Sequence, residues 1–216
     1  MLVYNIVLMG KRFIIDNINK KILFPIIIAI IISLAAYWIP QSVVDINKLT
    51  YVNTFIDDLI PFFSPAVVIY VLAFVQWAFS FYILLTQDTL FGKRICAALA
   101  IGSIFCFIIF ILFPTSILRN NVEPNNFFNY IISFLYSFDA PVDILPSFHC
   151  MYTTLSIIVI NHSKELDNKF KIINVIFSVL VFTSMLLTKQ HCFVDVPSGV
   201  LVAYIFYLLS IKLIKE

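Results

Sequence analysis

Residues 22–39 read ILFPIIIAIIISLAAYWI, eighteen residues without a charged side chain. About 20 apolar residues at about 1.5 Å each cross the roughly 30 Å hydrocarbon core of a bilayer, so this stretch predicts a transmembrane helix. The whole chain of 216 residues is 62% hydrophobic and 12% charged, whereas soluble domains carry roughly 25% charged residues. Further predicted spans are 65–85, 95–113, 147–160, 170–187 and 196–214. The sequence therefore predicts an all-α, polytopic membrane protein with six transmembrane helices in one bundle.

The segment 1–21 precedes this bundle and is expected to lie on the cytoplasmic membrane surface, because it is basic and partly amphipathic. A cleaved signal peptide is not expected, since the apolar stretch 2–9 is short and the first span lacks a small-x-small cleavage site. Residues 22–216 are then one membrane domain, with no length left for a soluble one.

The segment 125–138, before the fourth span, has a helical period. It separates two sets of side chains: Phe127, Phe128, Ile131, Ile132 and Leu135 on one face, and Asn126, Asn129, Ser133 and Ser137 on another. About 14 residues are too few to cross the bilayer, so we predict an amphipathic helix lying at the outer interface. It could gate lateral access of a lipid, or serve only as a surface anchor.

The basic residues divide unevenly between the two sides that six spans define. Eleven of the fourteen fall on the side of the termini: Lys11, Arg12, Lys20, Lys21, Lys93, Arg94, Lys164, Lys169, Lys171, Lys212 and Lys215. Only Lys48, Arg119 and Lys189 fall on the other side. The positive-inside rule then places both termini in the cytoplasm. An integral protein of a plasma membrane is expected, and the abundance of Ile, Asn, Lys and Phe favours a bacterial inner membrane.

The four cysteines show no CxxC pair and no metal-ligand spacing. Cys96 and Cys106 are interpreted as small apolar packing residues. Cys150 and Cys192 each follow a histidine; packing is again the favoured interpretation, with a disulfide on the outer face as the alternative. No basic run interleaved with aromatic residues indicates nucleic-acid binding, and the outer loops hold no carboxylate cluster of the kind that Mg²⁺ prefers. Asp57 and Asp58 come nearest to one and are interpreted as surface or structural residues.

The stretch TKQHCFVD at 188–195 lies where the third outer loop meets the last predicted span. His191 and Asp195 are four residues apart, which on a helix puts both on one face, where the carboxylate can accept a hydrogen bond from the imidazole. This contact would fix the tautomer and leave the other ring nitrogen free as base, nucleophile or ligand. Taken alone, the same spacing is also typical of a merely stabilising contact at a helix start.

The stretch LPSFHCMY at 145–152 lies where the second outer loop meets the fourth predicted span. Pro146 suits the first turn of a helix, and the free N–H groups of a helix N-terminus favour a phosphate. Ser147 would add a hydroxyl donor, and His149 would lie over the same place. Both histidine motifs fall on one predicted side together with Arg119 and Lys189, and charged groups at membrane depth usually face a cavity or a partner. We therefore expect one anion-binding site on the outer face.

These residues resemble a known family. PSFH at 146–149 and HxxxD at 191–195 are similar to the second and third signature motifs of the type 2 phosphatidic acid phosphatase superfamily, and FPTSILR at 113–119 resembles its first motif. That first motif, DDLIPFFSP at 57–65 and the approach from Asp139 to PSFH look like the branch with inositol phosphorylceramide synthases and related bacterial proteins. The resemblance covers roughly residues 55–210 and implies a six-helix membrane fold with an outward or lumenal active site.

The resemblance also implies a role for each matching residue. His191 would be the nucleophile that attacks phosphorus, with Asp195 orienting it, and His149 would protonate the leaving oxygen. Ser147 and Arg119 would bind phosphate oxygens. The family's third motif often has an arginine six residues before its histidine, where this chain has Met185, and the lysine of the fuller first motif would fall at Leu112. Lys189 is our predicted replacement for these cations; the alternative is a residue that merely snorkels to the interface.

The predicted function is a lipid-phosphate phosphatase that needs no metal or other cofactor and acts through a phosphohistidine. Its expected partners are the membrane and a lipid phosphate or diphosphate within it, whose identity the sequence leaves open, as it does the oligomeric state. One alternative is a head-group phosphotransferase of the same fold, because the motifs do not separate water from an alcohol as acceptor. Others are a non-catalytic lipid-binding or transport protein, and a haem carrier with His149 and His191 as axial ligands.

Overall fold

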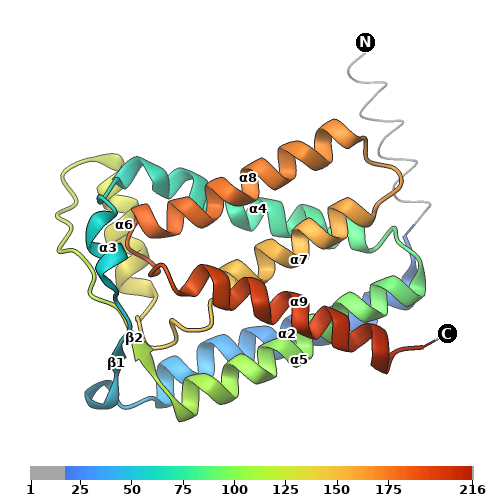
Figure 1. The fold of residues 1–216 in the computed structure, drawn as a ribbon, viewed down its shortest axis with the longest axis horizontal. Helices are drawn as coiled ribbons and strands as arrows, with labels where there is room; N and C mark the ends of the chain where they lie inside the picture. The colour runs from blue at the N-terminus through green and yellow to red at the C-terminus, as the bar shows by residue number, and fades with distance from the viewer. Residues whose placement is uncertain (1–17, 216) are drawn as a thin grey trace.

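The predicted spans are helices that run side by side along one axis in the computed structural model, which describes residues 18–215 (Figure 1). In chain order they are α2 (Lys20–Val43), α4 (Val67–Leu84), α5 (Thr89–Leu112), α7 (Phe148–His162), α8 (Asn168–Leu187) and α9 (Asp195–Leu213). A single 3-10 turn, η2 (Ser64–Ala66), leads directly into α4. The all-α prediction is confirmed.

Within residues 18–215, five of these helices are long and apolar enough to cross a membrane: α2, α4 with η2, α5, α8 and α9. Their outward faces expose large apolar side chains such as Phe24, Ile31, Val75, Ile176 and Leu208. In water such a surface would be costly, whereas acyl chains cover it without cost. The chain is therefore an all-α integral membrane protein.

The remaining predicted span, 147–160, is the helix α7, but it has 15 residues and is about 22 Å long. It is shorter than the bilayer core, so the structure leaves the sixth crossing a prediction. Helix α7 contacts α4, α5, α8 and α9, and most of its first three turns is buried. A helix surrounded by protein need not be uniformly apolar, which is why its hydropathy is the weakest of the six.

Polar side chains of α7 and its neighbours pair with one another inside the bundle. Trp77 Nε1 donates to Thr153 Oγ1 at 3.1 Å, and the hydroxyls of Ser156 and Ser80 lie 2.7 Å apart. The Tyr152 hydroxyl lies 2.7 Å from that of Ser33. Such contacts hold membrane helices together, because inside the bilayer a polar group without a protein partner finds no water for a hydrogen bond.

Side-chain caps fix where several helices begin. Asp88 Oδ1 accepts from Phe91 N at 2.8 Å and starts α5, and Asp167 Oδ1 accepts from Phe170 N at 2.7 Å and starts α8. Both helices therefore begin before the predicted spans at 95 and 170, because charged residues, Lys93 and Arg94 in α5 and Lys169 in α8, separate each helix start from its apolar run.

Short elements cover one end of the bundle, the left end in Figure 1. Strands β1 (Thr50–Tyr51) and β2 (Thr115–Ser116) pair in parallel, and α3 (Phe55–Leu59) follows β1. The predicted amphipathic helix is present as α6 (Phe127–Phe138) at the same end. Its burial differs from the prediction: Ile132 is buried, but Phe127 is exposed with Tyr130, Phe134 and Phe138. Helix α6 thus has two apolar faces, one against the bundle and one pointing outward.

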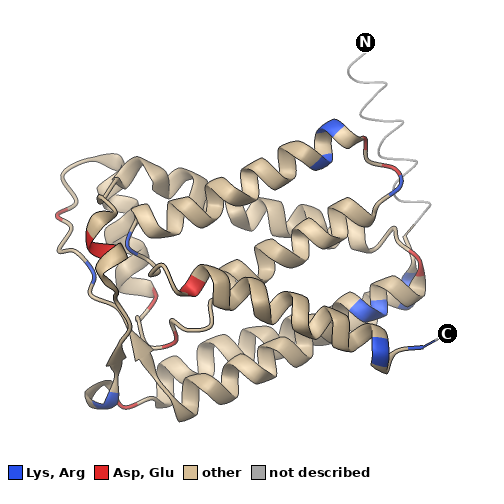
Figure 2. Cartoon of the chain, in the orientation of Figure 1, with Lys and Arg blue, Asp and Glu red and all other residues tan. Residues whose placement is uncertain are grey.

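The charged residues of the described part gather as the sequence analysis expects. Figure 2 shows Lys and Arg concentrated at the end of the bundle where α9 ends, and few at the end with β1, β2 and α3. Hydrogen bonds confirm that the starts of α2 and α5 and the ends of α4 and α9 lie at this Lys- and Arg-rich end. Asn19 N donates to Leu85 O, and Arg94 Nε donates to Ile214 O. Most of the predicted segment 1–21, including Lys11 and Arg12, lies outside the described residues.

Candidate functional site

The two predicted histidines come together at the end of the bundle covered by α3 and α6. His149 lies in the first turn of α7, and His191 lies in the turn that precedes α9. Their ring centroids are 5.7 Å apart and the ring planes are inclined by 49°. The third histidine, His162, lies at the other end of α7, where it stacks on Phe91 and contacts Asp88.

Asp195 holds the His191 ring. Its Oδ2 lies 3.1 Å from His191 Nδ1 and also accepts from the Cys192 backbone N–H at 2.9 Å. The aspartate is fully buried as the first residue of α9, and the histidine side chain is 13% exposed. The predicted contact is present, although residues 188–194 form a turn rather than a helix. With Nδ1–H donating to the carboxylate, His191 has its Nε2 lone pair free.

Aromatic side chains enclose His149. Its ring stacks on Tyr70 with a centroid separation of 4.3 Å, and the rings of Trp77 and Phe74 meet it edge-on with centroid separations of 4.5 and 5.5 Å. His149 Nε2 is buried and has no hydrogen-bond partner within the described chain. No sequence pattern indicated this enclosure, which holds the His149 ring in place beside that of His191.

Ser147 caps α7, where its Oγ accepts from Cys150 N at 3.2 Å. The helix starts one residue later than the motif suggested: Pro146 precedes the cap, after a cis peptide bond, instead of lying in the first turn. Helix α9 approaches this point very closely through Gly199, at which a Cβ would lie 2.5 Å from Ser147 O. A glycine one turn after Asp195 thus lets the starts of α7 and α9 meet.

Arg119, in the loop after β2, reaches the same region. Its guanidinium donates to the Asp139 carbonyl and, at 2.8 Å, to Gln190 Oε1, and it lies 3.6 Å from the Asp139 carboxylate. Its Cζ lies 4.7 Å from the centroid of the Tyr136 ring. Gln190 directly precedes His191, so Arg119 is joined to the histidine pair by one side chain. Neither Gln190 nor Tyr136 was predicted.

Lys189 is oriented by α3. Its ammonium donates to the carbonyls of Asp57 and Ile60, both at 2.6 Å. Asp57 Oδ1 in turn accepts from Phe193 N at 2.7 Å, so α3 holds the 188–194 turn from two sides. Asp57 is 5% exposed, which agrees with the structural role expected for it. The proposed contact of Lys189 with phosphate stays a prediction, because both observed donations go to α3.

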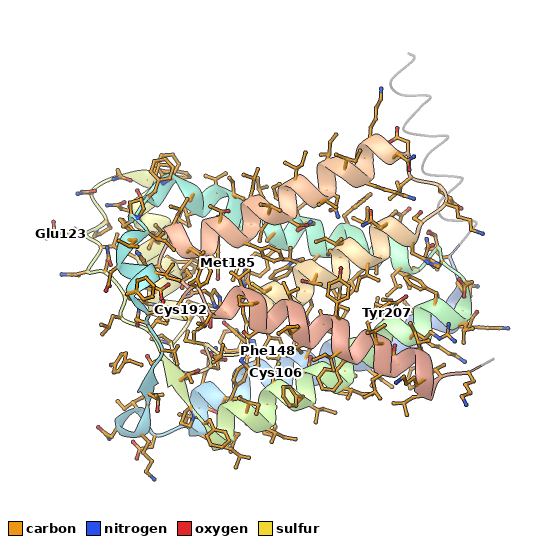
Figure 3. All side chains as sticks on the ribbon, viewed as in Figure 1. Cys106, Glu123, Phe148, Met185, Cys192 and Tyr207 are labelled. Carbon is orange, nitrogen blue, oxygen red and sulfur yellow. The ribbon has the colours of Figure 1, made fainter. Side chains whose placement is uncertain are left out.

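Met185, at the position of the family's arginine, is a fully buried core residue. It lies at the end of α8 near Cys192 (Figure 3), and its Sδ is 3.9 Å from Cys150 Sγ. Leu112, at the position of the family's lysine, is exposed. Cys150 and Cys192 are buried free thiols, so the packing interpretation holds and the alternative disulfide is absent.

A carboxylate pair lies behind Arg119. Tyr37 and Gln41 of α2 donate to Asp139 Oδ1. Asp143 is 7% exposed, and burial together with the negative charge of Asp139 raises its pKa to about 8. We expect Asp143 to be protonated at neutral pH, which spares the pair a direct repulsion.

No protein-family model, curated protein or solved structure matches this chain.

Several buried polar atoms of this end have no partner within residues 18–215: Arg119 Nε, Gln190 Nε2, His149 Nε2, Asp143 Oδ2 and Asp195 Oδ1. Buried polar groups are normally hydrogen-bonded, so a cluster of exceptions marks a place that a ligand or water fills. A separate crevice of about 560 Å³, lined by Lys48, Asp45 and the ends of α2 and α5, contains none of the predicted site residues. Among the described residues no group of His, Cys, Asp and Glu could hold a metal ion.

Proposed function

We propose that this protein is a membrane lipid phosphatase that transfers a phosphoryl group to His191 and then to water. The observation that carries the proposal is the pairing of His191, held by buried Asp195, with His149 at a ring separation of 5.7 Å. Two imidazoles at this spacing can act on opposite sides of one phosphorus atom. The similarity of both motifs to the type 2 phosphatidic acid phosphatase superfamily supports the same assignment.

In the first step, the Nε2 lone pair of His191 attacks phosphorus and the P–O bond to the lipid breaks. Asp195 stabilises the positive charge that develops on the His191 ring. His149, protonated in this step, gives its proton to the leaving alkoxide, which departs as the alcohol. In the second step, neutral His149 takes a proton from water, the hydroxide attacks the phosphohistidine, and His191 is released with inorganic phosphate as product.

The equatorial oxygens of the transferred group carry negative charge that needs donors around them. The Arg119 guanidinium, the Ser147 hydroxyl and the N-terminus of α7 would supply these donors without a metal ion. Each lies at the same end of the bundle as the histidines.

The proposed membrane orientation puts this site on the extracytoplasmic face and both termini in the cytoplasm. Its support is the charge distribution of Figure 2, in which the end opposite the histidine pair carries most of the Lys and Arg. In this arrangement α7 is the sixth crossing, shielded from lipid by its neighbours. Helix α6 then lies in the outer interface with Phe127 and Phe134 toward the acyl chains, beside the path of a lipid whose head group enters the site.

A phosphate-release screen tests the function. The purified protein in detergent is given a set of lipid phosphates and diphosphates with EDTA present, and wild type is compared with His191→Ala. We expect at least one substrate to release phosphate with wild type and none with the variant. Addition of polyol alcohols reports the alternative acceptor: phosphate that moves to the alcohol instead of to water would identify a phosphotransferase. Binding of lipid phosphates without any turnover would instead indicate that the protein is a lipid-binding or transport protein.

A further inference from the structure

Gln190 is a residue whose environment the proposed roles leave unexplained. Its side chain is 1% exposed, in the turn between α8 and α9, and a buried polar side chain is costly unless it is hydrogen-bonded. One half of the amide is used: Oε1 accepts from Arg119 Nη2 at 2.8 Å. The other half, Nε2, is buried and has no acceptor within residues 18–215.

The direction of this amide is fixed by chemistry. A guanidinium has donors and no acceptor, so the amide must turn its oxygen to Arg119 and its NH₂ group away. Leaving a buried donor unpaired destabilises the fold, and an acceptor oxygen of a ligand removes that cost. Arg119 Nε and His149 Nε2 are unpaired in the same way.

These three nitrogens are connected by short steps. Arg119 contacts Gln190, Gln190 is bonded to His191 through the chain, and the His191 ring is 5.7 Å from that of His149. All three therefore belong to side chains that lie around the histidine pair. A group that could satisfy several donors at once carries several acceptor oxygens, as a tetrahedral oxyanion does.

We infer that the Gln190 amide is an oxyanion-binding donor, which with Arg119 Nε holds a phosphate oxygen beside His191. This inference rests on the proposed function for its catalytic meaning, but the binding itself does not require turnover. Gln190 occupies the role that the sequence analysis gave to Lys189, whose ammonium is engaged by α3. A neutral donor fixed by Arg119 takes the place of a second cation.

The test measures the dissociation constant of inorganic phosphate, and separately of a short-chain lipid phosphate, by calorimetry on the purified full-length protein. Gln190→Met removes the amide at similar volume, and Gln190→Glu keeps an acceptor for Arg119 while removing the donor. The matched control is Gln41→Met, which removes an amide that supports Arg119 only through Asp139. A hydrogen bond to a charged group is worth roughly 1.5–3 kcal/mol, so both Gln190 variants should weaken phosphate binding by about 10-fold or more at pH 7.5, and the control by less than about twofold.

The inference would be overturned by wild type without phosphate affinity, by Gln190→Glu with wild-type affinity, or by equal losses in Gln190→Met and Gln41→Met. If the Met variant does not fold, the Glu variant carries the test. Failure of the proposed function can be distinguished from failure of this inference. If only the function is wrong, phosphate binding will still depend on Gln190, but the protein will hydrolyse no lipid phosphate. Conversely, turnover with an unchanged KM and unchanged phosphate affinity in Gln190→Met would leave the function and remove the inference.

Discussion

Replacing Gly199 by alanine tests whether the close contact of α7 and α9 builds the site. A Cβ at this position would lie 2.5 Å from Cys150 Cβ and 2.5 Å from Ser147 O. Carbon atoms pack at about 3.5–4.0 Å, so the two helix starts would have to separate by about 1 Å. Neither neighbouring atom is the flexible end of a side chain that could move aside alone.

The separation acts directly on the proposed catalytic pair, His149 and His191. His149 is two residues after Ser147, and Asp195, which holds His191, is one turn before Gly199. A misplacement of about 1 Å can cost on the order of 10²-fold in rate, so we expect kcat to fall by about that factor. Alanine normally stabilises a helix by up to about 1 kcal/mol relative to glycine, but overpacking costs about 1–3 kcal/mol. The net stability should therefore fall or stay level instead of rising.

The assay measures phosphate release and thermal unfolding in detergent for Gly199→Ala and for the matched control Gly102→Ala. At Gly102 of α5 the added Cβ would meet Met151 Sδ at 3.1 Å and two side-chain carbons at 3.5 Å, and a flexible thioether can yield. The control should keep near wild-type kcat and stability. Equal activities in the two variants would refute the reasoning that Gly199 sets the distance between the histidine motifs.

Asp195→Asn should lower kcat by on the order of 10³-fold, because an amide neither fixes the His191 tautomer nor stabilises the cationic ring; retention of more than a tenth of the activity would contradict this role. His149→Ala should lose phosphoryl transfer from alkyl phosphates but keep a single-turnover burst of phenol from aryl phosphates, whose leaving oxygen needs no proton, while the later hydrolysis of the phosphohistidine slows for both; equal losses of the first step on both classes would argue against a general acid. Asp143, with a pKa of about 8 in the fold and an ordinary value of 3.8, keeps a proton that the unfolded chain releases. Folding stability should therefore fall as pH rises from about 4 to about 8, and Asp143→Asn should flatten that dependence in thermal unfolding between pH 5 and 9; parallel curves would show that Asp143 does not titrate as stated.

The fold was predictable where hydropathy acts on whole helices. The spans 22–39, 65–85 and 196–214 match α2, α4 with η2, and α9 closely, because lipid-facing side chains must be apolar over the full crossing. Hydropathy is less informative for α7, whose polar side chains are paired by α2 and α4. The short length and central position of α7 depend on the surrounding helices α4, α5, α8 and α9, which are distant in sequence and do not enter a hydropathy average over neighbouring residues.

The end of the bundle was predicted less well, since it depends on long-range contacts. Strands β1 and β2 have two residues each and join segments 65 residues apart, so no local pattern marks them. Helix α3 has five residues and is held by the 188–194 turn through Asp57 and Lys189. The outward aromatic face of α6 was missed because the helical period was assigned one apolar side, whereas an interfacial helix packed on protein needs two.

The site illustrates which chemistry a linear sequence can carry. The contact of His191 with Asp195 was predictable, since four residues of separation keep the two side chains close in a helix or in a turn. Gln190 was not, because a glutamine next to a histidine has no pattern of its own until Arg119, 71 residues earlier, takes its oxygen. Lys189 has the more conspicuous charge but is turned to α3. In our proposal the anion-binding group is therefore Gln190, whose amide N–H groups have no acceptor within residues 18–215, whereas Lys189 already donates to two backbone carbonyls.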